Sequence, residues 1–293
     1  MQIINFRTTF FSTLINIYPE TEIQSFFNIL IEFRLKLSRI EVALNSYYEI
    51  NENDLTFLKK ALIDLKTHIP IQYIVGETEF FGLTFKVNEN VLIPRPETEE
   101  LVNWIIEDTK LKTQNSKYQI LDIGTGSGCI PISLAKNLPN TIVCAVDISP
   151  QALKTAKKNA QINNVHIHFI EKNILNTTRL PNTYDLIVSN PPYIRDLEKK
   201  QMQQNVLDNE PHLALFVKDQ NPLLFYNKIA ELAKAHLTKN GCLFFEINQY
   251  LGKETVDLLH TKGFKNIELR KDMFGADRMI KASINKQVKT TKH

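Results

Sequence analysis

The sequence predicts an α/β fold in which a doubly wound, mostly parallel sheet follows a small N-terminal helical bundle. Three observations predict it: helical periodicity over residues 1 to 70, short apolar strands alternating with amphipathic helices from Lys117 onward, and a glycine-laced turn after one of those strands. The chain has 293 residues and 43% apolar content, which can bury a sizeable core and is more than one small domain needs. We therefore expect two domains.

The first 70 residues carry apolar side chains at the spacing that lines one face of a helix. They are Ile15 and Ile17 in a first segment, Ile23, Phe26, Phe27, Leu30 and Phe33 in a second, and Leu55, Leu58, Leu62 and Leu65 in a third. From Gln72 to Leu92 the pattern alternates instead, with turn signals at Gly76 and Gly82. The expectation is a helical domain over 1–70 and a β-hairpin linker over 71–95.

Residues 96–283 are expected to form the second domain, which a helix from Glu97 to Asp108 opens. Apolar runs predict strands near 119–123, 142–146, 166–170 and 184–189, with helices near 129–137 and 150–163 between them. A helix over 222–237, a strand over 242–247, a helix over 252–261 and a closing strand pair follow. Because parallel strands need crossover connections, this alternation predicts the doubly wound sheet.

The tetrapeptide Asn190-Pro191-Pro192-Tyr193 follows the last of the four early strands. The Asn190 side chain and the Pro191 backbone each offer a carbonyl oxygen, and consecutive prolines fix φ and remove competing N–H donors. Such acceptors can hold both N–H groups of a planar amide or amine and aim its lone pair at an electrophilic methyl group, so that catalysis is mainly orientation. Tyr193 would supply a flat wall.

A plainer interpretation of the same tetrapeptide is ordinary loop punctuation, since Asn-Pro and Pro-Pro are common after strands. Its position at the carboxyl end of a buried strand favours the functional interpretation, because ligands of open α/β sheets gather there.

A second motif, Gly124-Thr125-Gly126-Ser127-Gly128, joins a strand to a helix. Glycines permit positive φ and a close approach of the backbone to a ligand. The spacing differs from the dinucleotide pattern G-x-G-x-x-G, and no Lys-Ser or Lys-Thr follows as in a P-loop, so phosphate is not the favoured ligand.

Asp147 ends the next strand, where its carboxylate could accept hydrogen bonds from both hydroxyls of a ribose. The alternative is that Asp147 caps the helix that follows, as Asp and Ser before Pro commonly do. Ser149 is the better placed cap of the two, which would leave Asp147 free.

With these motifs the chain resembles the class I S-adenosylmethionine-dependent methyltransferases, and within them the release-factor glutamine N5-methyltransferases (the PrmC/HemK family). The resemblance covers most of the chain, and the string Leu92-Ile93-Pro94-Arg95-Pro96-Glu97-Thr98-Glu99 is its most discriminating part. Other matching segments are Pro70 to Gly76, Phe80 to Leu83, the glycine turn, Asn190 to Ile194, and Glu210-Pro211.

The resemblance implies a seven-stranded sheet whose last strand is antiparallel. It implies that the residues from Gly124 to Gly128 (Gly124, Thr125, Gly126, Ser127, Gly128) line the methionine portion of S-adenosyl-L-methionine, that Asp147 holds the ribose, and that Asn173 and Ile174 flank the adenine. Asn190 would border both cofactor and substrate, and Pro191, Pro192 and Tyr193 would complete a glutamine pocket. The methyl acceptor would be a glutamine side chain of a peptide chain release factor.

The chain departs from the family pattern at three places. Asn173-Ile174 stands where an acidic residue and an aromatic are common, so adenine recognition would rest on an amide and an aliphatic wall. The segment from Val217 to Pro222 replaces a glycine-rich turn. The segment from Phe245 to Gln249 keeps Glu246 and Gln249 but lacks the His-Gly between them, and no catalytic role is assigned to Glu246.

Charge argues against a nucleic-acid partner. The net charge is +3, but four lysines in residues 281–293, with no acid among them, account for more than that excess. Residues 1–85 hold seven Lys or Arg against ten Asp or Glu, a net charge of −3. A domain with this charge is poorly suited to bind the phosphate backbone of a nucleic acid. Residues 284–293 are expected to form a basic, flexible tail.

No metal site, disulfide or membrane segment is expected. Cys129, Cys144 and Cys242 are widely spaced, and His166 with His168 would share a strand face without a third ligand. No apolar run approaches the roughly 18 residues that span a bilayer, and no signal pattern opens the chain, so we expect a cytoplasmic protein.

Two other functions fit part of the pattern. An enzyme that methylates adenine N6 or guanine N2 needs the same hold on a planar amine, and base flipping would bring the base into the same pocket. The acidic first domain and the Leu92-to-Glu99 string argue against this alternative. A non-catalytic binding scaffold would not need Asn190, Asp147 and the three glycines.

Overall fold

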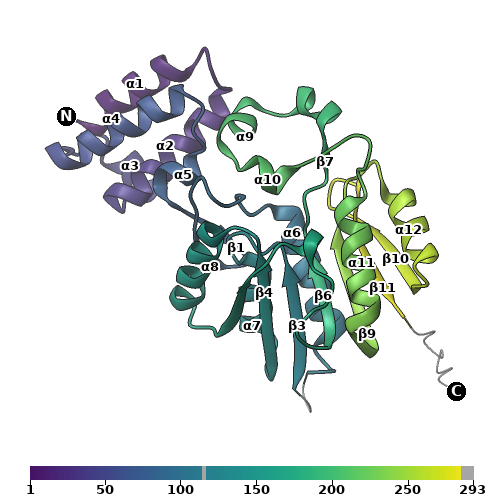
Figure 1. The fold of residues 1–293 in the computed structure, drawn as a ribbon. Helices are drawn as coiled ribbons and strands as arrows, with labels where there is room; N and C mark the ends of the chain where they lie inside the picture. Colours follow the sequence, from purple (N-terminus) through teal and green to yellow (C-terminus); the bar gives the residue numbers. More distant parts are fainter. Residues whose placement is uncertain (114–116, 285–293) are drawn as a thin grey trace, which may run out of the picture. The chain divides into compact units, whose positions relative to one another are not determined.

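The structure is a computed structural model that describes residues 1–113 and 117–284. The chain forms two compact units (Figure 1). One contains Met1–Gly76 together with Gln203–Asn209, and the other contains Glu77–Met202 together with the chain from Glu210 onward.

The first unit is helical. Its helices are α1 (Ile3–Leu14), α2 (Glu20–Leu35), α3 (Arg39–Leu44), α4 (Glu52–Lys66), α5 (Ile71–Val75) and the later α9 (Gln204–Asn209). Buried Phe6, Phe10 and Phe27 pack together at its centre. The prediction that Ile15 and Ile17 mark the first helix was wrong: α1 ends at Leu14, and Ile15 is exposed because Ile3, Phe6, Phe10 and Leu14 form the buried face.

The predicted hairpin exists but is shorter than the alternating pattern indicated. Residues 71–75 form helix α5, which ends at Gly76 with φ of 72°. The strands β1 (Glu77–Phe80) and β2 (Leu83–Lys86) then pair antiparallel around Phe81 and Gly82. A segment of five residues, four of them apolar, fits a buried helical turn as well as a strand, which is why alternation alone misplaced the start.

The second unit is built on a seven-stranded sheet with the order β10-β11-β9-β6-β3-β4-β5. Its strands are β3 (Tyr118–Ile123), β4 (Thr141–Asp147), β5 (Ile167–Glu171), β6 (Tyr184–Ser189), β9 (Leu237–Glu246), β10 (Lys265–Lys271) and β11 (Asp277–Ser283). The last strand, β11, runs antiparallel to both of its neighbours, whereas the pairings among β3, β4, β5, β6 and β9 are parallel. The predicted fold class is confirmed.

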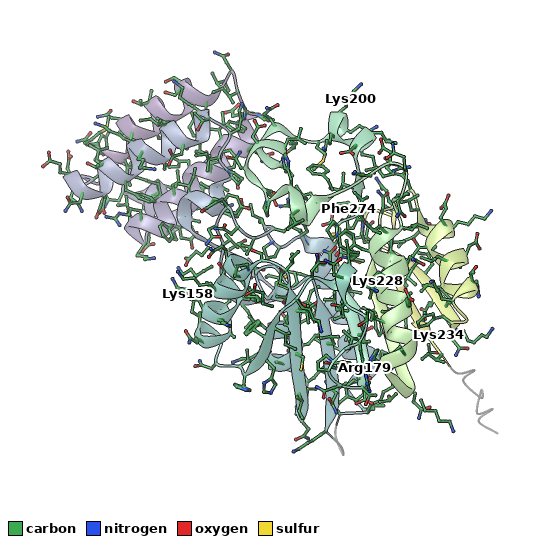
Figure 2. The ribbon with its side chains drawn as sticks, in the orientation of Figure 1. Lys158, Arg179, Lys200, Lys228, Lys234 and Phe274 are labelled. Carbon is green, nitrogen blue, oxygen red and sulfur yellow. The ribbon has the colours of Figure 1, made fainter. Side chains whose placement is uncertain are left out.

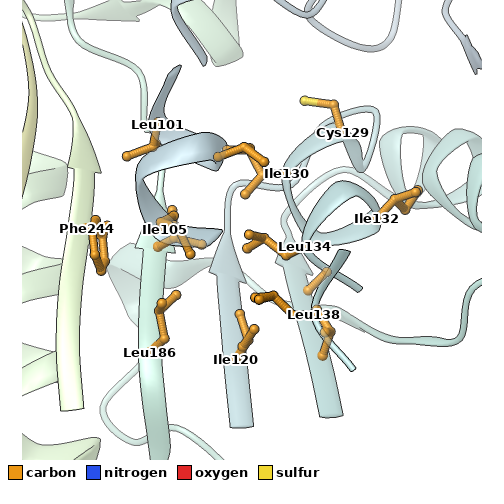
Figure 3. Close-up of a cluster of buried hydrophobic side chains, with 14 of the residues drawn as sticks. Leu101, Ile105, Ile120, Cys129, Ile130, Ile132, Leu134, Leu138, Leu186 and Phe244 are labelled. Atoms are coloured by element: carbon orange, nitrogen blue, oxygen red, sulfur yellow. The ribbon is translucent and has the colours of Figure 1, made fainter. Parts of the chain in front are cut away.

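Helices cover both faces of this sheet, because alternate residues of each central strand point to opposite faces. On one face Ile120 and Leu186 pack with α6 (Pro96–Thr109), α7 (Cys129–Asn137) and α8 (Pro150–Ile162) (Figure 3). On the other, Leu121 and Ile187 pack with α11 (Leu224–His236) and α12 (Gly252–Thr261). Exposed Lys158 and Lys234 lie on the solvent sides of α8 and α11 (Figure 2).

Several short elements after β5 were not predicted. They are β7 (Ile194–Arg195), which pairs in parallel with β8 (Phe216–Val217), the 3₁₀ helices η1 (Ile174–Asn176) and η2 (Asp196–Gln201), and α10 (His212–Leu215). Elements of two to six residues are too short to show a period. The predicted basic tail lies outside the described residues except for Ile284.

Candidate active site

The site lies where three neighbouring parallel strands end. From β3 the chain moves to β4 and β5 on one side and then returns to place β6 on the other, so β3 and β6 flank the point at which the strand order reverses. Ile123 of β3 pairs with Val146 of β4 and with Ser189 of β6. The glycine turn, Asp147 and Asn190 therefore leave the sheet side by side, at the place where open α/β sheets bind ligands.

The glycine turn adopts a conformation that needs glycine at three positions. Gly124, Gly126 and Gly128 have φ of 79°, 54° and 83°. A Cβ at Gly126 would meet nothing within 4 Å, and a Cβ at Gly124 would lie 3.9 Å from the backbone oxygen of Asn190. The turn thus presents bare backbone to open space.

Asp147 holds this turn in place. Its Oδ2 accepts a hydrogen bond from the Gly126 N–H at 2.8 Å, and its Oδ1 accepts one from the Ser149 N–H at 2.9 Å. Ser149 caps α8 by accepting from the Ala152 N–H, as predicted. The expectation that Asp147 would be free was wrong, because backbone donors on both sides converge on the end of β4. Each carboxylate oxygen can still accept a second bond.

A cavity of about 300 Å³ opens at these strand ends. Of the residues predicted to bind cofactor or substrate, its lining includes Gly124, Gly126, Asp147, Asn173, Ile174, Asn190, Pro191 and Pro192. Thr125, Ser127, Gly128 and Tyr193 do not line it.

The three turn residues outside the lining support it from behind. Thr125 and Ser127 are buried, and the Ser127 carbonyl accepts from the Asn159 side chain at 2.9 Å. A Cβ at Gly128 would lie 2.9 Å from Ile132 Cδ1, so this glycine permits close packing of the start of α7.

Asn173 and Ile174 form the start of η1 at the cavity wall. The Asn173 side chain accepts from the Leu175 N–H at 3.0 Å and so caps this 3₁₀ turn. Ile174 is buried and offers an aliphatic surface.

Asn190 has a definite orientation. Its Nδ2 donates to the Thr98 hydroxyl at 3.3 Å, and no residue in the described ranges donates to its Oδ1. Because one end of the amide is engaged, the carbonyl end is the available acceptor.

Tyr193 acts behind the cavity rather than on its surface. Its hydroxyl donates to Glu246 Oε1 at 3.0 Å, and its backbone carbonyl accepts from Asn248 Nδ2. Desolvation by burial, followed by the neighbouring Glu246 charge, raises the pKa of the Tyr193 phenol. The phenol therefore stays protonated and acts as a donor.

Glu246 and Thr98 are site residues that the sequence argument missed. Glu246 ends β9 and is buried, and its Oε2 accepts from the Thr98 hydroxyl at 2.6 Å. Burial raises the pKa of Glu246, and the bonds from Thr98 and Tyr193 lower it in part. Thr98 lay in the string that was most discriminating for the family, but no pattern within the string indicated which of its side chains turns inward.

Comparison with known proteins identifies the family. Residues 12–76 match the family described as "PrmC N-terminal domain", and residues 108–216 match the one described as "Methyltransferase small domain". A protein of Flavobacterium psychrophilum named "Release factor glutamine methyltransferase" is 57% identical over 283 residues, which cover 97% of this chain and 99% of that protein. The chain belongs to the release factor glutamine methyltransferase family.

Other relatives agree with this membership, which confirms the resemblance seen in the sequence. A Bacteroides thetaiotaomicron protein of the same name is 40% identical over 272 residues, covering 92% of this chain and 96% of the relative. The solved structure of the "hMettl16 catalytic domain in complex with MAT2A 3'UTR hairpin 6" has a TM-score of 0.57 at 17% identity, covering 82% of this chain and 88% of that one. That likeness shows the shared fold alone.

In this member of the release factor glutamine methyltransferase family, two matching segments that are distant in sequence meet in the structure. Glu210 is buried, and its carboxylate pairs with the Arg95 guanidinium and accepts from the Ile93 N–H. Pro211, the next residue, lines the cavity. A buried, paired carboxylate thus fixes the Leu92-to-Glu99 string against the cavity wall.

Asp122 is a buried acid just before the glycine turn. It is 0% exposed, and neither of its oxygens has a hydrogen-bond partner among the described residues. Burial raises the pKa of Asp122 to about 7, and the nearby Thr125 hydroxyl, which is not positioned for a full hydrogen bond, offsets this only in part.

Asp122 should make stability depend on pH in a specific direction. Between about pH 4 and 7 the folded carboxyl keeps a proton that the unfolded chain releases, so the free energy of unfolding falls as pH rises across this range and levels off above pH 7. Moving this pKa from 3.8 to about 7 corresponds to roughly 4 kcal/mol between the two limits. Asp122→Asn mimics the protonated acid and cannot titrate. Urea unfolding at pH 5, 6, 7 and 8 should show the wild type losing stability relative to this variant, whereas parallel curves would contradict the assignment.

Within the described ranges, no helix is long and apolar enough to cross a bilayer, and no group of three or more His, Cys, Asp or Glu side chains is arranged to hold a metal. The three cysteines are buried, free thiols.

Proposed function

We propose that this protein transfers the methyl group of S-adenosyl-L-methionine to the side-chain amide nitrogen, N5, of a glutamine in a peptide chain release factor. The observation that carries the proposal is the Asn190 amide, whose oxygen is available at a cavity that the glycine turn and Asp147 also line. The 57% identical relative named "Release factor glutamine methyltransferase" supports the substrate class.

The residues at the cavity fit this cofactor. Bare backbone at Gly124 and Gly126 admits close contact with the methionine portion, Asp147 retains acceptor capacity for the ribose, and Ile174 offers an apolar surface to the adenine beside Asn173. Thr125, Ser127 and Gly128 lie outside the cavity lining and support the turn from behind. When bound, the cofactor supplies an electrophilic methyl group on a sulfonium.

The protein's contribution is the hold on the acceptor amide. Asn190 Oδ1 and the Pro191 carbonyl accept from the two N–H groups of the glutamine, and Pro192 keeps this turn rigid because its φ is fixed. Held this way, the glutamine nitrogen would present its lone pair to the methyl donor. S-adenosyl-L-methionine would supply the methyl carbon for the new N–C bond, the electrons of the broken S–C bond would pass to sulfur, and one N–H proton of the glutamine would leave to solvent. Orientation of this kind replaces a general base, since no side chain of pKa near 7 can deprotonate an amide.

The remaining assignments follow from a release-factor substrate. The activity belongs in the cytoplasm. The division into a helical domain, a hairpin linker and a methyltransferase domain is proposed as a functional one, and the net charge of −3 over the first 85 residues disfavours a nucleic-acid substrate.

The test is mass spectrometry of purified release factors after incubation with the enzyme and the methyl donor. We expect a gain of one methyl group on one glutamine. Methylated RNA or DNA in a parallel incubation, with unmodified release factor, would favour a nucleic-acid amino-group methyltransferase. No measurable affinity for the cofactor by calorimetry would favour a scaffold.

A further inference from the structure

The two ends of the Asn190 amide are not equivalent for the proposed reaction. The carbonyl end can accept from the substrate amide, whereas the NH₂ end would place donors against donors. The two orientations have nearly the same shape, so packing alone does not choose between them. The choice must come from the hydrogen bonds that the side chain makes.

A chain of hydrogen bonds with a fixed direction leads to this amide. The Glu246 carboxylate accepts from the Thr98 hydroxyl at 2.6 Å and from the Tyr193 hydroxyl at 3.0 Å. Since the single Thr98 proton is directed to Glu246, the Thr98 oxygen is left as an acceptor, and it accepts from Asn190 Nδ2 at 3.3 Å.

Strand register and helix placement bring these groups together. Ser189 of β6 pairs with Phe245 of β9, so Asn190, the first residue after β6, and Glu246, the last residue of β9, follow at the same end of two adjacent parallel strands. Thr98 lies in the first turn of α6, and Thr98 and Glu246 are 2% and 1% exposed. Both residues are therefore shielded from solvent and depend on each other for hydrogen bonds.

We infer that Glu246, acting through Thr98, determines which end of the Asn190 amide faces the cavity. If Asn190 were reversed, its oxygen would need the Thr98 proton, and a buried carboxylate oxygen would lose its donor. Losing a hydrogen bond at a buried charged group disfavours that arrangement by about 10- to 100-fold. Glu246 and Thr98 are thus positioning residues, and the inference rests on the proposed function because Asn190 is taken to hold the substrate amide.

The variants remove the hydroxyl of Thr98 or the charge of Glu246 while the size of each side chain stays nearly constant. Thr98→Val removes the hydroxyl at nearly constant size, Thr98→Ser restores it, and Glu246→Gln replaces the carboxylate with a group that can donate to Thr98. Thr109→Val is the matched control, because Thr109 is buried on the same helix and, among the residues that the structure describes, its hydroxyl bonds only to the Ile105 carbonyl.

In turnover assays on release factor, Thr98→Val and Glu246→Gln should each lower kcat by about 10- to 100-fold, with the dissociation constant of the cofactor changed less than about threefold. Thr98→Ser should recover most of the rate, and Thr109→Val should leave it unchanged. The double variant should be no worse than about threefold below either single variant, since both break one chain. A Thr98→Val rate near that of the wild type, or no recovery with serine, would overturn the inference.

A second readout does not depend on turnover. In ¹H–¹⁵N spectra, the side-chain NH₂ signal of Asn190, identified by its loss in Asn190→Ala, should move in Glu246→Gln and Thr98→Val and stay in place in Thr109→Val. An Asn190 signal that stays in place in both Glu246→Gln and Thr98→Val refutes the inference that Glu246 and Thr98 orient Asn190, even if the wild type proves inactive on release factors. Conversely, an inactive wild type whose signal moves as expected would refute the proposed function alone.

Discussion

Asn190→Ala is expected to lower kcat by about 100- to 1000-fold, the loss typical of removing one fixed polar group that acts at the reacting centre. The truncated side chain can no longer accept from the glutamine amide, so the nitrogen lone pair is not aimed at the methyl group. The fold should persist, because the lost protein contact is one bond to Thr98 at 3.3 Å. Single-turnover kinetics with release factor, together with calorimetry of cofactor binding, would measure both quantities.

The matched control is Gln161→Ala. It removes an exposed side-chain amide near the C-terminal end of α8, which is the end farther from the cavity. Its kcat should equal that of the wild type. If Asn190→Ala keeps more than about a third of wild-type kcat, the substrate amide is held elsewhere and the proposed mechanism is wrong.

Asp147→Ala is expected to raise the dissociation constant of S-adenosyl-L-methionine by about 10- to 100-fold through the loss of a charge-assisted ribose contact. The loss should be compounded by loosening of the glycine turn, since Asp147 also accepts from the Gly126 and Ser149 N–H groups. The temperature midpoint of unfolding should therefore fall as well. Calorimetry and thermal unfolding of the same preparation would separate the two effects.

Glu171→Ala provides the comparison for Asp147. Glu171 pairs with Asp147 in the register of β4 and β5, is exposed, and does not line the cavity, so its removal should change neither quantity. A lowered unfolding midpoint with an unchanged dissociation constant in Asp147→Ala would reassign Asp147 to holding the turn alone.

Short-range sequence patterns predicted those parts of the site that lie within one turn at the end of one strand. The glycine turn after β3 and the Asn-Pro-Pro-Tyr turn after β6 were recognisable because glycine and proline have fixed conformational consequences within a few residues. Ser149 was predicted as a cap for the same reason. Asp147 was placed correctly at the end of β4 but not recognised as bonded, because its donor at Gly126 comes from the turn after another strand.

The partners of these motifs could not be predicted. Thr98 and Glu246 are 148 residues apart, and Arg95 and Glu210 are 115 residues apart. Pairing over such distances depends on strand order and register, which apolar periodicity does not encode. For the same reason the assignment of Gln203–Asn209 to the helical unit had no sequence signal.

The amino-acid sequence by itself determined the family, the alternation of strands and helices, and the residues that present backbone and an amide at the strand ends, because each depends on local conformational preference. Only the tertiary structure decided that Asp147 accepts hydrogen bonds from two backbone N–H groups, that Tyr193 lies behind the cavity, and that Glu246 and Thr98 orient Asn190. Those are hydrogen bonds between buried groups brought together by the sheet, and their direction follows from which partner can donate a proton.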